Sequence, residues 1–330
     1  MNLKGVVPLI EPVSKKLLRE ELTTNRLVRP TRIGSNEVYI FTALKAPNLM
    51  QEVGRLRELT FRDVGAGFGA PADIDHFDTD GNPCRQLIVW DPVDEEIIGG
   101  YRFNIFHQFK RKPLQDIPLV NKSLYNISNT FTSEYIPYIV ELSRAFIQPK
   151  YQPNLAGRKG AFSLDNIWDG LGALVVKYPF IRYFFGRLTF FSNYDQTVRD
   201  LAFYFFAKHL QGNPALLRAK NPFECPTPLS DLKKVISGSS IKEDFTNLQQ
   251  VAKNHGSTIP PLVKSYLNVS ATLKVFEPVF DPYFGSSYAA AILVTIADIY
   301  PVYVKRYITP YQCYLAEIKE QKTKEYHCGN

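Results

Sequence analysis

The stretch PYIVELSRAFIQPKYQPNLAGRKGA, residues 137–161, decides how the rest of the chain is arranged. After Pro137 come an aromatic residue and two β-branched residues, 138–140, which favour a buried strand. Two charged residues, Glu141 and Arg144, interrupt this strand. Because side chains alternate along a strand, Arg144 is expected on the same face as Leu142 and Phe146, opposite Glu141. A carboxylate in mid-strand is costly unless it is paired or solvated in a cleft, so the stretch indicates a functional site or a structural ion pair.

Prolines and glycines end this strand and predict a loop before a helix over residues 164–176. Arg158, Lys159 and Gly160 lie in the predicted loop. A strand, a basic glycine-bearing loop and a helix can hold a phosphate-bearing ligand at the helix N-terminus. The same layout also describes an ordinary turn between a strand and a helix, with a salt bridge at the surface.

The composition is that of a globular protein. Of the 330 residues, 45% are apolar and 22% are charged, which argues against disorder. The four cysteines are scattered without a C-x-x-C pair, so we expect reduced thiols in a cytoplasmic protein and no metal site. The sequence contains no run of about 18 apolar residues, so it predicts no membrane span. The first residues have too short an apolar run for the core of a signal peptide.

The formal net charge of +7 favours acidic partners such as nucleic acid, anionic lipid or an acidic carrier protein. No nucleic-acid-binding motif is present, so we expect no nucleic acid partner. The 23 Phe and 19 Tyr residues indicate an apolar ligand, a membrane surface or a bulky core. Ser14 is expected to cap a short basic helix that contacts a membrane, an acidic protein or its own domain.

The order of predicted elements is typical of an α+β fold around one central sheet. It reads strand (38–44), helix (47–63), irregular loop (65–83), strands 86–90, 97–106 and 138–146, helix, strand (188–191), helix (197–209), then a polar insertion, a helix from 260 to 270 and strands 273–280 and 288–296. We expect a basic N-terminal extension (1–36), one catalytic-type domain (37–298) with an insertion near 211–257, and a helical tail (299–330).

Several short motifs occur in one order along this domain. They are R-x-x-x-F (Arg57 and Phe61), D-x-x-D (Asp75 and Asp78), the strand arginine of IIGGYRF (Arg102), E-x-x-R (Glu141 and Arg144), and IPPLVKSYLNVSATLKVFEPVFDPYFG (259–285). With them, the chain resembles the hemolysin-like branch of the GNAT superfamily, the N-acyltransferases that make lyso-ornithine lipid and glycine lipid. That branch is similar in turn to acyl-homoserine-lactone synthases. The resemblance covers about residues 38–296, and the region 211–257 matches poorly.

The resemblance implies a GNAT fold, a central mixed sheet flanked by helices. It also implies transfer of a long, 3-hydroxylated acyl chain from a thioester, acyl carrier protein or acyl-CoA, to the α-amine of ornithine or glycine, with no bound cofactor. The usual acetyl-CoA loop, Q/R-x-x-G-x-G/A, is not met at Gln152 or Arg158. This departure and the basic charge favour acyl carrier protein, with Arg158, Lys159 and Gly160 on the donor side.

The reaction requires a neutral amine, and Glu141, oriented by Arg144, is the expected proton acceptor. Asp75 and Asp78 are expected to hold the ammonium group or order the loop, although such aspartates often only make turn hydrogen bonds. The expected substrate-binding residues are Arg57, Phe61 and Arg102. A strand bulge is expected to supply backbone N–H groups to the thioester oxyanion.

Two other functions remain open from the sequence. A signal synthase that makes acyl-homoserine lactone would use the same motifs, but it lacks the 259–285 block and is shorter. A membrane-active, non-enzymatic protein would use the aromatic residues and the basic N-terminus. For the enzyme, peripheral association with the inner face of the cytoplasmic membrane is expected.

Overall fold

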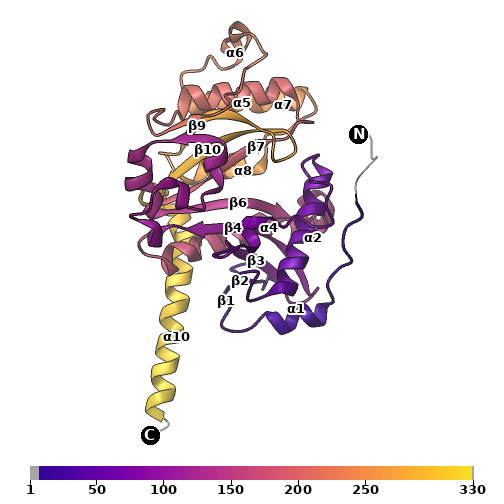
Figure 1. The fold of residues 1–330 in the computed structure, drawn as a ribbon, viewed down its shortest axis with the longest axis vertical. Helices are drawn as coiled ribbons and strands as arrows, with labels where there is room; N and C mark the ends of the chain where they lie inside the picture. The colour runs from indigo at the N-terminus through magenta and orange to yellow at the C-terminus, as the bar shows by residue number, and fades with distance from the viewer. Residues whose placement is uncertain (1–6, 329–330) are drawn as a thin grey trace.

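A mixed eight-stranded sheet runs through the part of the chain described by this computed structural model, residues 7–328 (Figure 1). The side chains of 153–156, 158, 159 and 322–328 lie outside that described part. The strands are β1 (Leu27–Pro30), β2 (Glu37–Phe41), β3 (Arg85–Asp91), β4 (Glu96–Ile105), β5 (Tyr125–Ile127), β6 (Ile139–Ile147), β7 (Tyr183–Phe190), β8 (Leu217–Ala219), β9 (Lys274–Asp281) and β10 (Ser287–Thr295).

The strand order is β1-β2-β3-β4-β6-β7-β10-β9, and β5 pairs with β8 in a separate small sheet. Within the eight-stranded sheet, the pairing of β6 with β7 is parallel and the other pairings are antiparallel. The helices are α1 (Lys15–Glu21), α2 (Pro47–Asp63), α3 (His76–Thr79), α4 (Pro153–Lys177), α5 (Gln196–His209), α6 (Leu229–Val235), α7 (Ile241–Asn254), α8 (Pro261–Val269), α9 (Pro301–Tyr303) and α10 (Thr309–Cys328). The mixed sheet flanked by helices confirms the predicted α+β fold class.

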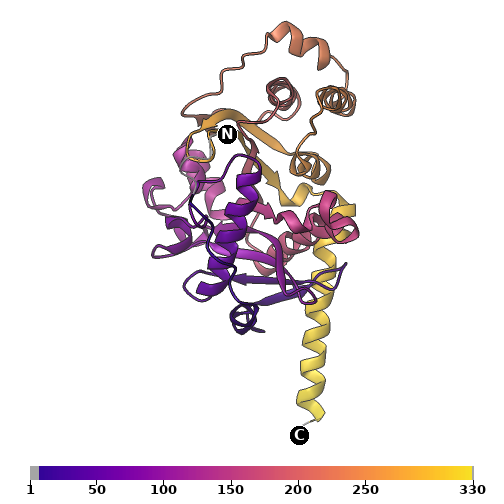
Figure 2. The same cartoon turned by 90° about the vertical axis from the view of Figure 1, so that its right-hand side faces the viewer.

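Both faces of the sheet are covered, and the alternation along β3 shows how. Leu87 and Val89 pack into one apolar cluster with α4, whereas Ile88 and Trp90 pack into another with α2. Figure 2 shows α2 and α4 on opposite sides of these strands. A strand buried on both faces reads as a continuous apolar run, which is what LIVW provides.

The predicted elements agree with the structure in most places. The helix predicted over 47–63 is α2, with the proline at its first position, where a missing N–H costs nothing. The helix expected from residue 164 begins at Pro153 instead, so the predicted basic loop lies inside α4. Its backbone is kinked at Gly157, which has φ 52°, a conformation that glycine adopts without strain.

Three segments contain helices or strands beyond those predicted from the sequence. Residues 27–30, assigned to the N-terminal extension, form β1 and pair with β2 at the edge of the sheet. The segment between β4 and β6 is a chain of short turns with β5, and it includes η2 (Leu114–Asp116) and η3 (Val120–Ser123). The stretch 211–257 contains β8, α6 and α7, and α7 is tied to α5 because Lys208 and His209 both contact Asp244 at 2.7 Å.

The C-terminal helix α10 leaves the body and projects away from it in both views (Figures 1 and 2). The helical turn just before α10 (Val304–Ile308) is anchored to α4, because Arg306 and Tyr307 bond Asp165 at 2.8 Å and 2.6 Å. In the described part of the chain, no helix is both long enough and apolar enough to cross a membrane.

Gly172 of α4 is required by the close approach of this C-terminal segment. A Cβ at position 172 would lie 2.2 Å from the carbonyl oxygen of Tyr307, whereas a Cβ at Gly170 would meet the Leu87 side chain at 2.7 Å. We expect Gly172→Ala to lower the free energy of unfolding by about 1–3 kcal/mol, because backbone atoms must move. Gly170→Ala is the matched control and should cost less, since the end of Leu87 can shift and alanine favours helix. Urea unfolding of both variants measures the difference, and equal losses would contradict this account.

Candidate active site

A buried cluster of charges joins three elements that are distant in sequence. Asp78 of α3 lies at its centre and is fully buried. Arg57 of α2 donates to both oxygens of Asp78 at 3.3 Å, and Arg102 of β4 donates to it at 3.2 Å. Gln86 of β3 donates to Asp78 at 2.8 Å and also accepts from Arg57. The motif residues Arg57, Asp78 and Arg102 are therefore brought together.

Asp75 and Asp78 also build the short helix α3 between them. Asp75 is the N-cap and accepts from the N–H of Phe77 at 2.9 Å, while Asp78 accepts from the N–H of Asp75 at 3.2 Å. This reciprocal capping explains the spacing of the D-x-x-D motif. Asp75 further accepts from Arg102 at 2.6 Å and is about a quarter exposed, 28%, so it is the acid of this pair that faces outward.

The electrostatics of Asp78 follow from these contacts. Burial alone raises the pKa of a carboxyl, but the positive charges of Arg57 and Arg102 outweigh burial and hold the pKa of Asp78 below its usual range. Asp78 is therefore an anion that fixes the cluster. Arg57, which is fully buried against it, is not among the residues that line the cavities described below.

Arg144 of β6 joins the cluster through a β-bulge. Opposite β4, the register skips one residue between Gly100 and Arg102, and Arg144 has φ 51°. A non-glycine residue at positive φ is strained by about 1–3 kcal/mol. The guanidinium of Arg144 lies 2.9 Å from Asp73 and 3.4 Å from Asp75, and its carbon lies 4.6 Å from the ring centroid of Phe284.

The bulge corrects two sequence-based predictions. Leu142 and Phe146 do not share a face, because Leu142 belongs to the apolar cluster with α4 and Phe146 to the cluster with α2. The predicted pairing of Arg144 with Glu141 is also wrong. The extra residue turns Arg144 toward the aspartates, on the same side as Ser143, whose hydroxyl accepts from Arg102 at 3.0 Å.

Glu141 is buried elsewhere, under the turn η3. Its carboxylate accepts from the backbone N–H groups of Val120 and Asn121, each at 2.9 Å, and from the Asn121 side chain at 2.7 Å. Burial raises the pKa of Glu141 in spite of these hydrogen bonds. It is not among the residues lining either cavity below. In this structure Glu141 holds the segment that forms one wall of the site, and its assignment as proton acceptor stays a prediction.

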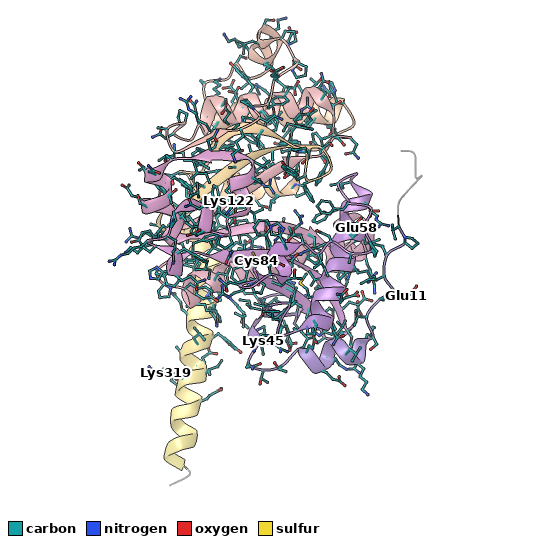
Figure 3. All side chains as sticks on the ribbon, in the orientation of Figure 1. Glu11, Lys45, Glu58, Cys84, Lys122 and Lys319 are labelled. Atoms are coloured by element: carbon teal, nitrogen blue, oxygen red, sulfur yellow. The ribbon has the colours of Figure 1, made fainter. Side chains whose placement is uncertain are left out.

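The larger cavity, about 1020 Å³, lies against the charge cluster. Its lining combines apolar and charged side chains. They are Phe68, Asp75, His76, Phe77, Arg102, Leu114, Gln115, Leu119, Val120, Lys122, Ser123, Tyr125, Asn126, Ile127, Arg144, Arg187, Lys220, Asp281, Tyr283 and Phe284. Lys122, which lines it, is labelled in Figure 3, as is Glu58 of α2 on the other side of that view. Such a volume is that of a site for a small-molecule ligand.

A smaller cavity of about 210 Å³ opens where β6 and β7 part. These strands pair over three positions, from Ile139 with Tyr183 to Glu141 with Phe185. Beyond them, residues 142–145 of β6 and 186–189 of β7 line the cavity together with Phe61, which the sequence analysis placed at the substrate. Arg144, Arg187 and Phe284 line both cavities, so the two meet at these side chains.

The remaining predicted residues concern the donor. Arg158 and Lys159 have side chains outside the described residues, and Gly160 is buried within α4. No group of three histidine, cysteine, aspartate or glutamate side chains that could hold a metal ion occurs among the residues that the structure describes.

Sequence reasoning missed several residues of the site. Arg187 of β7 donates to Asp281, at the end of β9, at 2.7 Å, and both line the larger cavity. Asp281 and Phe284 are the ends of a D-x-x-F segment in the quoted 259–285 block, which could have drawn attention to them. Asp73 and Arg187 carry no such signal, because neither belongs to a motif.

Comparisons with known proteins place the chain among acyltransferases. Residues 56–157 match the acetyltransferase (GNAT) domain family. The chain is 40% identical over 291 residues, 88% of its length and 86% of the relative's, to the glycine N(alpha)-acyltransferase of Bacteroides thetaiotaomicron. It is 39% identical to the glycine N(alpha)-acyltransferase of Phocaeicola vulgatus, over 88% of this chain and 89% of that protein. No solved structure matches the chain.

Removal of the charge at Asp78 should destabilise the fold in a pH-dependent way. Asp78→Asn leaves two buried arginines without their shared anion, so we expect the free energy of unfolding at pH 7 to fall by about 3–5 kcal/mol. Because the folded pKa of Asp78 lies below the unfolded value of about 3.9, its contribution is present above about pH 4 and is lost as the pH falls through the folded pKa. Urea unfolding from pH 7 to pH 3.5 should show that the difference in free energy of unfolding between wild type and Asp78→Asn becomes smaller as the pH falls. Asp63→Asn, at an exposed position, should stay within about 0.5 kcal/mol at each pH.

Glu141→Gln tests whether this carboxylate holds the wall formed by η3. A glutamine must turn an NH2 group toward backbone donors, so we expect a loss of about 1–3 kcal/mol in the free energy of unfolding. Hydrogen exchange, followed by mass spectrometry, should speed up in residues 114–127. Glu134→Gln, at an exposed position of the same connection, is the control. Unchanged exchange in Glu141→Gln would show that the wall does not depend on this residue.

Proposed function

This chain belongs to the GNAT-type amino-acid N-acyltransferases, and we propose that it transfers a long fatty acyl chain from a thioester to the α-amine of glycine. Membership rests on relatives that are about 40% identical over 88% of the chain. Both are named glycine N(alpha)-acyltransferase. Their names favour glycine over ornithine, the other acceptor that the sequence analysis left open.

The observation that carries the proposal is the meeting of two cavities at Arg144. One runs between the parted strands β6 and β7, whose facing backbone edges are not paired with each other beyond Glu141. An extended arm that contains amide groups can hydrogen-bond to such edges as an added strand does. The phosphopantetheine arm of an acyl thioester has this chemistry. The other, larger cavity then remains for the acceptor and for part of the acyl chain.

The reaction is direct attack of the amine on the thioester carbon. The amine nitrogen forms the amide bond, the carbon–sulfur bond breaks, and the thiol leaves with a proton in place of the acyl group. Glu141 lines neither cavity, whereas Asp75 lines the larger one and is held by Arg102 and Arg144. We therefore propose Asp75, in place of Glu141, as the acid that receives the ammonium group and its proton. Backbone N–H groups at the bulge of β6 are proposed to stabilise the oxyanion.

For the donor, we propose acyl carrier protein. The chain lacks the usual acetyl-CoA loop, and its net charge of +7 suits an acidic carrier. We further propose that the acyl chain is 3-hydroxylated, as the resemblance to the lipid-making branch implies. Apolar residues that line the larger cavity, among them Leu114, Leu119 and Ile127, provide a surface for such a chain.

The product would be an amphiphile, so we also propose that the mouth of the larger cavity contacts a membrane surface. Two aromatic side chains of the lining, Phe68 and Tyr283, are 47% and 68% exposed. Lys122 and Lys220 line the same cavity and supply positive charge. Exposed aromatic rings beside lysines suit an anionic interface.

A direct assay tests the proposed reaction. Purified protein is incubated with long-chain acyl carrier protein or acyl-CoA, with and without a 3-hydroxyl group, and with glycine, ornithine or S-adenosylmethionine. We expect N-acylglycine by mass spectrometry, with acyl carrier protein as the better donor. A lactone from S-adenosylmethionine would favour the signal synthase, and the absence of any acyl-amino acid would refute the proposal.

Asp75→Asn tests the acid that faces the cavity. We expect kcat for N-acylglycine formation to fall by about 100-fold or more, the range of general acid–base catalysis. Asparagine can still cap α3, and Arg102 and Arg144 keep Asp78 and Asp73 as their partners, so the fold should be retained. Asp80→Asn, on the same loop and exposed, is the matched control and should keep wild-type kcat. Equal rates for wild type and Asp75→Asn would exclude Asp75 as the proton acceptor.

A further inference from the structure

We propose that Arg187, held by Asp281, is the binding site for the carboxylate of the amino-acid acceptor. This inference rests on the proposed glycine acylation and names the residue that selects the acceptor. Arg187 lies on β7 and lines the larger cavity together with Arg102 and Arg144 of the charge cluster. Neither the motifs nor the comparisons assign it a role.

The charge balance of the larger cavity favours an anion. Its lining contains five cationic side chains, Arg102, Lys122, Arg144, Arg187 and Lys220, and two carboxylates, Asp75 and Asp281. The acceptor brings a carboxylate into this cavity, and that group does not take part in the chemistry. One of the five cations is therefore expected to neutralise it.

Four of these cations are already held by hydrogen bonds to the protein, although Nη2 of Arg102 is buried without a hydrogen-bond partner. Arg102 and Arg144 bind the aspartates of the cluster. Lys122 donates to the carbonyl oxygens of Gln115 and Ile117, at 2.9 Å and 2.7 Å, and Lys220 donates to the carbonyl of Lys122 at 2.8 Å. These four side chains hold the walls of the cavity.

Arg187 differs because only one of its nitrogens is used in the described part of the chain. Its Nη1 donates to Asp281 at 2.7 Å. Asp281 is itself fixed, because it accepts from the N–H of Tyr283 at 2.9 Å and is almost fully buried. Asp281 thus fixes the orientation of the guanidinium through Nη1. The N–H groups of Nε and Nη2 remain available as the two parallel donors that match a carboxylate.

The position of Arg187 also suits the reaction. It lines both the cavity between the parted strands and the larger cavity, as Arg144 does. An acceptor whose carboxylate binds Arg187 is therefore placed where the thioester cavity meets the larger one. Asp75, which also lines the larger cavity, attracts the other end of the same zwitterion.

The test compares glycine with glycinamide, which has the same amine but no carboxylate. Wild type should strongly prefer glycine. In Arg187→Gln, the KM for glycine should rise about 10-fold to 100-fold, and the preference for glycine over glycinamide should largely disappear. The KM for the acyl donor should not change, since the donor's thioester does not need this charge. Asp281→Asn should show a smaller rise in the KM for glycine.

Arg182→Gln is the matched control. Arg182 immediately precedes β7, is exposed, and stacks on Tyr138 outside both cavities. The Arg182→Gln variant should prefer glycine over glycinamide to the same extent as wild type. If Arg187→Gln does not fold, Arg187→Lys keeps the charge but loses the paired donors, and a wild-type preference in that variant would overturn the proposal.

The outcomes separate this inference from the proposed function. Wild-type protein that does not acylate glycine contradicts the function itself. Wild-type protein that acylates glycine, with the same preference for glycine over glycinamide in Arg187→Gln, leaves the function standing and overturns the role of Arg187.

Discussion

The bulge at Arg144 is the constraint on which the rest of the site depends. One additional residue in β6 puts Arg144 at φ 51° and turns its side chain onto the face that carries Asp73 and Asp75. A bulge also bends its strand and increases the local twist. In the same region β6 stops pairing with β7, and the space between the two strands becomes a cavity. A single backbone irregularity thus both completes the charge cluster and accompanies the opening through which a thioester can reach it.

The strain at Arg144 persists because the surroundings hold the residue in place. Its guanidinium has two carboxylates on one side and the ring of Phe284 on another. The cluster as a whole contains three aspartates and three arginines, so its formal charge is balanced although it is largely buried. Burial of any one of these charges without its partners would cost several kcal/mol. The six residues therefore form a unit that sets the irregular path of residues 65–80 as much as it sets the chemistry.

Sequence reasoning predicts what depends on local pattern and fails where one residue alters the register. The proline at position 47 and the following apolar spacing predict α2 correctly, and the apolar run of β3 predicts a buried strand. The E-x-x-R motif predicts that Glu141 pairs with Arg144, and alternation predicts that Arg144 shares a face with Leu142 and Phe146. The bulge breaks both predictions, and no glycine or proline within β6 marks it. Prolines and glycines predict a basic loop around Arg158, but within Pro153–Lys177 the backbone is helical on both sides of a kink at Gly157.

Arg187 is a residue whose place in the site cannot be predicted from local sequence pattern. It lies in an unremarkable strand, and its partner Asp281 follows almost one hundred residues later, so the pair exists only after β7, β10 and β9 assemble side by side. Once assembled, the charged residues that line the larger cavity suit the change in charge that the proposed acylation causes. The proposed acceptor, free glycine, is a zwitterion with no net charge, whereas the proposed product, N-acylglycine, has lost its ammonium group and is an anion. A cavity lined by five cations and two carboxylates is more complementary to the second state than to the first, so its field favours loss of the amine proton as the amide bond forms.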